Sequence, residues 1–269
     1  MELAQVEARV RYVNDSWKGA AEMPQINTGD ERRAVTTYRD VRIADARPLH
    51  ERGALDLESS GFTMTRHQTA VTDFFDAEQI QTLYYPEMES VVRAHTGADA
   101  LFVMDHLVRS ERPSESFVTN YARFMHLDYS EDAVVLAKRY KLVKGGFCDA
   151  SEAEHYDIAM LNTWQPFDHV VEKNPLTLID ARSLREADLV DFAIEGGDGR
   201  LPVHNPDHRL YYFPRMQPDE LLVFKQMDTR PGRVRWCPHT SFDDPNSPAE
   251  APKRRSIEIR WLAAFRRSR

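Results

Sequence analysis

A histidine and an aspartate stand one residue apart in the segment Met125-His126-Leu127-Asp128. On an extended backbone, residues two apart point to the same side. His126 and Asp128 could therefore offer one imidazole nitrogen and one carboxylate oxygen to a single metal ion. A third ligand far downstream would complete the 2-His-1-carboxylate face that holds non-heme Fe(II) in oxygenases, with other positions open. A His-x-Asp pair is common by chance. It therefore indicates a metal site only if the rest of the chain supplies a third ligand.

His239 is the best candidate for the third ligand among the ten histidines. It closes the expected strand Arg235-Trp236-Cys237-Pro238-His239 in the later part of the chain. Further on, Arg254 and Ser256 share one side of another expected strand. A guanidinium binds a carboxylate through two parallel hydrogen bonds, and a serine hydroxyl can add a third. This arrangement suits the distal carboxylate of a 2-oxoacid whose other end chelates iron.

Simpler interpretations of the same residues stay open. His239 could be a loop histidine bonded to the backbone, and Arg254-Arg255 could be a solvated basic patch. Cys237-x-His239 resembles half of a zinc site, but no second Cys/His pair follows at a suitable spacing.

Further residues are candidates for lining a pocket. Asn162 and Trp164 share a face of an expected strand, where they could line a pocket or simply pack. Lys225 is a charged residue inside an apolar strand, so it points either to solvent or into a polar cavity. Tyr211 is included as a pocket residue, and Arg260 either lines the pocket or replaces Arg254 as the clamp.

The composition is that of an ordinary globular protein. The chain has 269 residues, 42% hydrophobic and 29% charged, and a net charge of −8. This charge argues against a nucleic-acid partner, which requires a basic face. Two cysteines make no disulfide framework, no apolar run is long enough for a membrane span, and residues 1–7 do not resemble a signal peptide. We therefore expect a cytoplasmic protein without a membrane partner.

Hydrophobic periodicity predicts helices and strands around the candidate residues. A helix over 76–96 is capped by Asp76 and ends at Gly97, and a second helix follows Ser130 as far as about Lys141. A third is expected after Ser183, because Ser183-x-x-Glu186 resembles a capping box. Gly196–Gly199 is expected to be a turn. Strands are predicted over 8–13, 100–106, 158–164, 210–213, 220–227, 234–240 and 256–263.

This pattern predicts a mainly β fold with flanking helices. Its core would be a double-stranded β-helix, the jelly-roll or cupin-like architecture. No linker divides the chain, so residues 1–269 are expected to form one domain. Residues 14–36 are interpreted as a surface loop, and residues 1–36 as a mobile or lid-like segment.

Several long segments resemble one oxygenase family. They include the His126 and His239 segments, Asn162-Thr163-Trp164-Gln165-Pro166, residues 174–183 and 211–225, and Arg254-Arg255-Ser256-Ile257-Glu258-Ile259-Arg260. The family includes the hydroxylase component of cephamycin C-7 methoxylation and fungal enzymes that form endoperoxides or aziridines. The resemblance extends from about residue 40 to residue 263.

The resemblance implies an Fe(II)/2-oxoglutarate-dependent oxygenase of secondary metabolism. It makes His126, Asp128 and His239 the iron ligands, and Arg254 with Ser256 and Asn162 the 2-oxoglutarate site. O2 would be the second co-substrate, and a small molecule with an unactivated C–H bond the substrate. The outcome could be hydroxylation, ring closure or desaturation.

One position departs from the family pattern. Gln165 stands where the family often has arginine, and the lost charge would indicate a different pocket if that arginine contacts a ligand. Two other classes are weighed: a non-catalytic cupin-like binding protein and a metal-dependent hydrolase with the same ligands. A homo-oligomer is left open.

Overall fold

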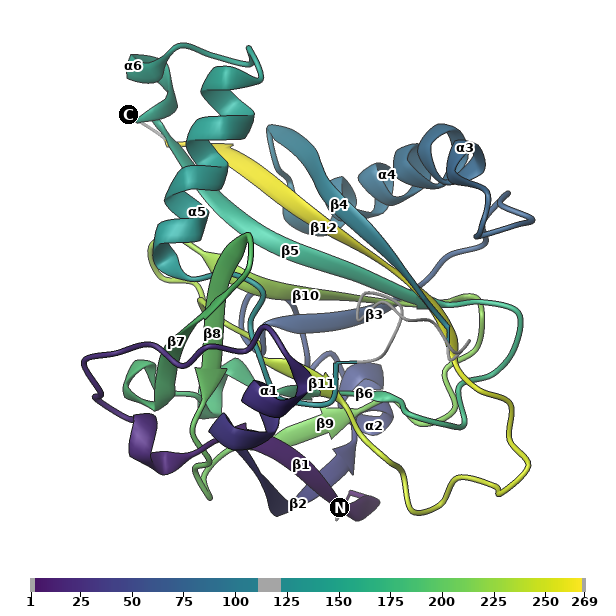
Figure 1. Ribbon diagram of the computed structural model, residues 1–269. Helices are drawn as coiled ribbons and strands as arrows, with labels where there is room; N and C mark the ends of the chain where they lie inside the picture. Colours follow the sequence, from purple (N-terminus) through teal and green to yellow (C-terminus); the bar gives the residue numbers. More distant parts are fainter. Residues whose placement is uncertain (1–2, 111–121, 268–269) are drawn as a thin grey trace.

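Two five-stranded β-sheets form the body of the protein (Figure 1). The computed structural model describes residues 3–110 and 122–267. The first sheet has the order β1-β2-β9-β6-β11 and the second the order β3-β10-β5-β12-β4. The strands of the first sheet are β1 (Gln5–Val13), β2 (Thr36–Asp45), β9 (Leu210–Tyr212), β6 (Leu176–Ile179) and β11 (His239–Ser241). Those of the second are β3 (Phe62–Arg66), β10 (Glu220–Asp228), β5 (Tyr156–Pro166), β12 (Arg255–Arg266) and β4 (Ala100–Ser110).

Strand β12 shows how the second sheet divides its side chains between two faces. Ile257, Ile259 and Trp261 are buried in the apolar cluster that also contains residues of the helix beside the sheet. The alternate residues, Ser256 and Glu258, are also buried but are polar. Side chains of a strand alternate between faces, so the polar set points to the side of the first sheet. The mainly β fold with flanking helices is confirmed.

The predicted helix over 76–96 is confirmed. It comprises α3 (Ala77–Gln79), a π-helical turn (Ile80–Tyr84) and α4 (Tyr85–Thr96). The side chain of Asp76 accepts hydrogen bonds from the first turn, and Gly97 ends the helix with φ 64°. These helices cover the outer face of the second sheet (Figure 1).

A second group of helices packs at one end of the second sheet (Figure 1). As predicted, Ser130 caps α5 (Glu131–Lys138), since its hydroxyl accepts a hydrogen bond from the N–H of Ala133 at 3.1 Å. A π-helical segment (Arg139–Lys144) and α6 (Ala150–Ala153) follow. None of the helices among the described residues is long and apolar enough to cross a membrane.

The predicted helix after Ser183 is wrong. The chain forms two short 3-10 turns (Ala181–Ser183 and Glu186–Asp188) and then the hairpin of β7 (Leu189–Ile194) and β8 (Gly197–Pro202). The hydroxyl of Ser183 donates to the carbonyl of Asp180 at 2.7 Å, so it caps no helix that follows. The expected turn at Gly196–Gly199 is only partly correct, because Gly197 onward is strand.

Two other expectations need correction. Of the strand predicted over 234–240, only His239 and Thr240 pair with a neighbour, as part of β11. The expected loop over 14–36 contains a 3-10 turn (Asp15–Trp17) and α1 (Gly29–Val35), which has a capping box of Thr28 and Glu31. A short helix, α2 (Arg47–Glu51), follows β2.

Candidate metal centre and its two cavities

His126 and His239 are held together by their own backbones. They form an isolated antiparallel bridge in which the N–H of His126 donates to the carbonyl of His239 at 3.1 Å and the reverse bond measures 3.0 Å. The ring centroids are 4.4 Å apart. The segment around His126 thus extends the edge of the first sheet beside β11, and two residues distant in sequence present their imidazoles together.

The tautomer of His126 leaves one ring nitrogen able to bind a metal ion. Its Nδ1 lies 2.8 Å from the carbonyl of Phe124, which can only accept, so Nδ1 carries the proton. Nε2 therefore has the lone pair, and it lies 3.7 Å from Oδ1 of Asp128. This geometry directs one nitrogen and one carboxylate oxygen toward a common point, as the spacing predicts.

Asp128 is fixed from two sides. Asn162 on β5 donates to its Oδ2 at 2.7 Å, and Arg260 on β12 donates to its Oδ1 at 2.8 Å. Burial would raise the pKa of this carboxyl, but the positive charge of Arg260 and the hydrogen bond of Asn162 contribute to lowering it below its usual range. Asp128 is therefore ionised, as a metal ligand must be.

Both imidazoles are neutral over the physiological range. Burial, and then the neighbouring His239, lower the pKa of His126 to about 4. Burial likewise lowers the pKa of His239 to about 4. A neutral imidazole binds a metal without first losing a proton.

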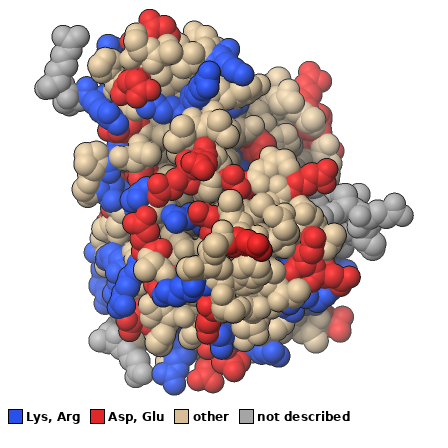
Figure 2. All heavy atoms as spheres, turned by 60° about the vertical axis from the view of Figure 1, so that its left-hand side comes forward, with Lys and Arg blue, Asp and Glu red and all other residues tan. Residues whose placement is uncertain are grey.

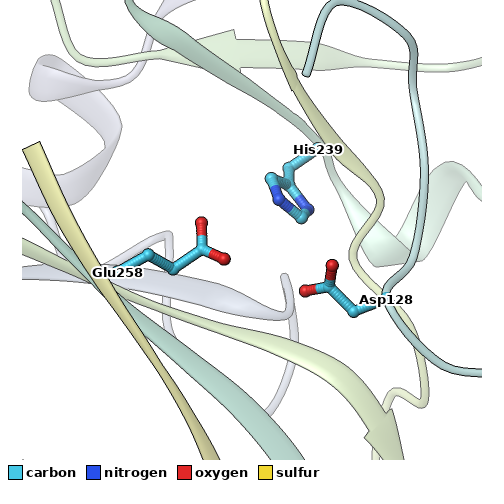
Figure 3. A group of neighbouring side chains, drawn as sticks. All are labelled: Asp128, His239 and Glu258. Atoms are coloured by element: carbon cyan, nitrogen blue, oxygen red, sulfur yellow. The ribbon is translucent and has the colours of Figure 1, made fainter. Parts of the chain in front are cut away.

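Glu258 is a fourth polar group at this point, and the sequence interpretation did not select it. Ligand atoms of Asp128, His239 and Glu258 all lie within 4.8 Å of one another. Figure 3 shows the two carboxylates and the imidazole pointing toward one another. Burial, and then the charge of Asp128, raises the pKa of Glu258. The signal was present in the sequence as a carboxylate within the apolar run Ile257-Glu258-Ile259.

Gln226 connects two of the candidate ligands and was also missed. Its Oε1 accepts a hydrogen bond from the N–H of Asp128 at 2.8 Å, and its Nε2 lies 3.4 Å from Nδ1 of His239. The register of β10 against β5 shifts between Lys225 and Met227, so Gln226 is the extra residue of a β-bulge. Bulges near functional sites redirect a side chain.

Arg254 lines a small cavity together with two of the candidate ligands. The cavity has a volume of about 10 Å³, room for about one water molecule, and is lined by His126, His239, Glu258, Arg254 and Trp164, among others. The guanidinium carbon of Arg254 lies 5.3 Å from the centre of the Trp164 ring, and its Nη1 donates to the carbonyl of Asn174. Ser256 is fully buried, and its hydroxyl has no hydrogen-bond partner among the described residues. A buried hydroxyl without a partner is costly unless a ligand satisfies it.

A second, much larger pocket of about 860 Å³ is lined by both His126 and Asp128. Apolar side chains from several elements form much of its wall: Ile26, Leu107, Phe124, Leu136, Tyr140 and Phe192. Arg260 also lines it. Leu136 and Tyr140 on the α5 side are more than half exposed, at 64% and 61%, so they mark the mouth of the pocket.

Other residues selected from the sequence lie elsewhere. Lys225 is buried and pairs with Glu58 at 2.8 Å and Asp228 at 2.7 Å, and it lines neither cavity. Tyr211 packs in an apolar cluster and also lines neither. Trp164 borders the small cavity and not the large one.

Gln165 points away from both cavities. Its Oε1 accepts from the hydroxyl of Tyr84 at 2.8 Å, and its Nε2 donates to the carbonyl of Pro218 at 2.7 Å. Tyr84 belongs to the helix on the outer face of the sheet. The departure from the arginine of the family pattern therefore does not alter either of these two cavities directly.

Cys237 does not support a zinc site. The thiol is buried and donates to the carbonyl of Ile179 at 3.4 Å, and burial raises its pKa well above the ordinary value. Zinc requires the thiolate.

The family model of an oxidoreductase/YMDC permease-like domain matches residues 10–264. The chain belongs to this oxidoreductase family. One relative is the alpha-ketoglutarate-dependent dioxygenase phiK of a fungal species, 28% identical over 97% of this chain and 96% of the relative. Another is the hydroxylase/desaturase efuI of Hormonema carpetanum, 28% identical over 91% of this chain and 89% of the relative.

Solved structures agree on the fold. The iron and alpha-ketoglutarate-dependent endoperoxidase NvfI superposes with a TM-score of 0.85 at 22% identity, over 99% of this chain and 100% of that one. The jelly-roll core predicted from the sequence is consistent with this match. The resemblance drawn from the sequence motifs is confirmed for the family, whose members named here include Fe(II)/2-oxoglutarate-dependent enzymes.

Proposed function

We propose that His126, Asp128 and His239 hold the Fe(II) of a 2-oxoglutarate-dependent oxygenase that oxidises an unactivated C–H bond of a small molecule. The observation that carries this proposal is that the buried side chain of Asp128 lies close to ring nitrogens of both histidines. His126 Nε2 lies 3.7 Å from Asp128 Oδ1, and the two histidines are joined by backbone hydrogen bonds. The relatives phiK, named an alpha-ketoglutarate-dependent dioxygenase, and efuI, named a hydroxylase/desaturase, support the same activity.

The donor set fits Fe(II). Two neutral imidazoles and one ionised carboxylate are the ligands of the facial triad that leaves positions for co-substrates. Asn162 and Gln226 supply the outer hydrogen bonds that orient Asp128 and contact His239. Such outer partners fix ligand orientation before a metal binds.

Arg254 and Ser256 would bind the distal carboxylate of 2-oxoglutarate. Arg254 lines the small cavity that His126 and His239 also line, Ser256 follows it by two residues, and both side chains are buried. Arg254 is preferred over Arg260 for this role, because Arg260 already contacts Asp128 and Asp105 and faces the large pocket. A guanidinium in a buried site binds a carboxylate strongly.

With 2-oxoglutarate and O2, bound Fe(II) supplies the oxidising power for hydrogen removal from carbon, and succinate and CO2 are released. The residues of the chain position the reactants and exclude water. His126 and Asp128 lie at the boundary of the large pocket, so a substrate there would place its reacting carbon beside them.

The large pocket favours a mainly apolar substrate. A pocket of about 860 Å³ is within the usual range for small-molecule sites. Ile26 contributes to its wall, which supports a covering role for part of the segment 1–36, although residues 5–13 are paired as β1 in the first sheet. Hydroxylation, ring closure and desaturation are all compatible with this wall.

The surface charge bears on the partners of the protein. Acidic and basic side chains are mixed over the face shown in Figure 2, which supports the expectation of no nucleic-acid partner. A single domain, a cytoplasmic location, the absence of a membrane partner and an open oligomeric state stay predictions.

Succinate formation tests the proposed function. Purified protein supplied with Fe(II), 2-oxoglutarate and air should convert 2-oxoglutarate slowly to succinate even without substrate, and Asp128→Ala should abolish this conversion. A binding protein or a hydrolase with the same ligands would form no succinate. Undiminished conversion by Asp128→Ala would move the carboxylate ligand elsewhere.

A further inference from the structure

Glu258 is a buried carboxylate whose contacts leave it oriented toward the metal site. It lies on β12 between Ser256 and Arg260 and is 4% exposed. Its Oε1 accepts no hydrogen bond within the described part of the chain, and Nε of Arg260 lies 3.5 Å from it. Figure 3 shows the carboxylate facing His239 and Asp128.

The distances place Glu258 within reach of the same ion as the proposed ligands. Two ligand atoms that each lie about 2.1 Å from one ion are at most about 4.2 Å apart. Atoms of Glu258, Asp128 and His239 lie within 4.8 Å of one another, and Nε2 of His126 lies 3.7 Å from Asp128. A small rotation of the Glu258 side chain would bring it around one ion with Asp128 and His239, and His126 adjoins this group through Asp128.

The same position conflicts with the co-substrate. An octahedral ion has six positions, so four protein donors leave only two. A 2-oxoacid chelate would take both of them and leave none for O2. Glu258 also lines the small cavity that contains Arg254, so its negative charge would face an entering dicarboxylate. Glu258 must therefore leave the ion when 2-oxoglutarate binds.

Arg260 offers Glu258 an alternative partner. Its Nε lies 3.5 Å from Oε1 of Glu258 and makes no hydrogen bond within the described residues. The other nitrogens of the guanidinium already hold Asp128 and Asp105. A short movement along β12 would convert the ion pair into a charge-assisted hydrogen bond.

We propose that Glu258 is a fourth, displaceable carboxylate ligand of the metal site, which 2-oxoglutarate drives onto Arg260. This inference rests on the proposed function, since it requires the ion to be held by His126, Asp128 and His239. Glu258 then strengthens metal binding only while 2-oxoglutarate is absent. Its displacement also weakens 2-oxoglutarate binding, because both compete for one side of the ion.

The test is Glu258→Gln, which keeps the size of the side chain and removes its charge. Mn(II) affinity is measured by calorimetry without and with saturating 2-oxoglutarate, which requires no turnover. Without 2-oxoglutarate, we expect the variant to bind Mn(II) about tenfold more weakly than the unaltered protein, the scale on which site partners act. With 2-oxoglutarate present, the difference should shrink to less than about threefold.

Asp105→Asn is the matched control. It removes one carboxylate that contacts Arg260 but leaves Glu258 in place. Its Mn(II) affinity should match that of the unaltered protein under both conditions. If it instead reproduces the effect of Glu258→Gln, the effect acts through Arg260 and the ligand role is overturned.

The other outcomes also decide the question. An unchanged Mn(II) affinity in Glu258→Gln, or an equal loss with and without 2-oxoglutarate, would overturn the role of Glu258 as a displaceable ligand. Asp128→Ala distinguishes this failure from failure of the proposed function. It should lose Mn(II) binding under both conditions, and retained binding would place the metal site elsewhere. Circular dichroism spectra of all variants show whether they are folded.

Discussion

His126 and His239 exchange two backbone hydrogen bonds, at 3.1 and 3.0 Å, although they lie in different halves of the chain. The relative position of their imidazoles is therefore set by backbone pairing and not by side-chain packing alone. A site built on paired backbone is more precise than a site built on free loops. The pairing explains how a short motif and a distant histidine can act as one metal centre.

Asn162 is predicted to support metal binding through Asp128. Asn162→Ala removes the 2.7 Å hydrogen bond to Oδ2 of Asp128. We expect Mn(II) affinity to fall about tenfold to a hundredfold, as for other groups that orient a ligand. Thr163→Val is the control, because Thr163 lies on the same strand but bonds Trp261 on the opposite face. Equal Mn(II) affinities in both variants would contradict the orienting role.

Arg254 is predicted to determine 2-oxoglutarate affinity. Arg254→Ala removes the buried cation from the small cavity, and charge-assisted hydrogen bonds contribute about 1.5–3 kcal/mol. The Kd for 2-oxoglutarate on the Mn(II)-loaded protein should therefore rise at least tenfold. Arg260→Ala serves for comparison and should mainly weaken Mn(II) binding, since Arg260 contacts Asp128. The reverse pattern would reassign the clamp to Arg260.

The metal-free protein is predicted to lose stability in mild acid. The pKa values of His126 and His239 are lowered from 6.5 to about 4, so between these values the unfolded chain binds protons that the folded chain does not. The free energy of unfolding therefore falls as the pH falls from about 6.5 to 4. The pKa of Glu258 is raised, so at this group the folded chain binds more protons than the unfolded chain. Its contribution to the free energy of unfolding therefore increases as the pH falls.

Urea unfolding at several pH values isolates the contribution of one histidine. His126→Gln has no imidazole to protonate, so its free energy of unfolding should fall less steeply over this range than that of the unaltered protein. Because the other histidines are common to both proteins, the difference in slope belongs to position 126. Parallel slopes would show that His126 titrates normally in the folded chain.

Gly199 is predicted to be required for the position of the ligand segment. A Cβ atom there would lie 2.5 Å from the carbonyl oxygen of Leu127, the residue between His126 and Asp128. This carbonyl accepts a hydrogen bond from the N–H of Arg200 at 3.1 Å. Gly199→Ala should lower the free energy of unfolding by about 1–3 kcal/mol, the usual cost of overpacking.

Gly197 provides the control for this substitution. It lies on the same strand, and a Cβ atom there would meet nothing within 4 Å. Gly197→Ala should therefore unfold at nearly the same temperature as the unaltered protein and bind Mn(II) equally well. A Gly199→Ala protein with unchanged stability would mean that β8 shifts freely past Leu127.

Local patterns predicted much of the scaffold. Apolar and polar residues alternate along Ser256–Trp261, which predicts that each set shares one face of a strand, and the structure confirms this division. The cap at Asp76 and the stop at Gly97 located the clearest helix. These features depend on neighbours in sequence, so the sequence is sufficient to recognise them.

The predictions from sequence failed where pairing with a residue distant in the chain determines the local structure. Ser183 resembles a helix cap, but its hydroxyl bonds back to Asp180, and the residues that follow pair as a hairpin. Gln226 contacts the candidate ligands Asp128 and His239 because β10 slips by one residue against β5. Neither event follows from local spacing, because each depends on what pairs with the strand.

The central claim is that one ferrous ion and 2-oxoglutarate meet at His126, Asp128 and His239. The most direct measurement is the visible spectrum of the anaerobic protein after addition of Fe(II) and then 2-oxoglutarate. We predict the weak charge-transfer band of the chelate in the unaltered protein and its loss in folded His239→Ala. No band in the unaltered protein, or an undiminished band in His239→Ala, would contradict the assignment.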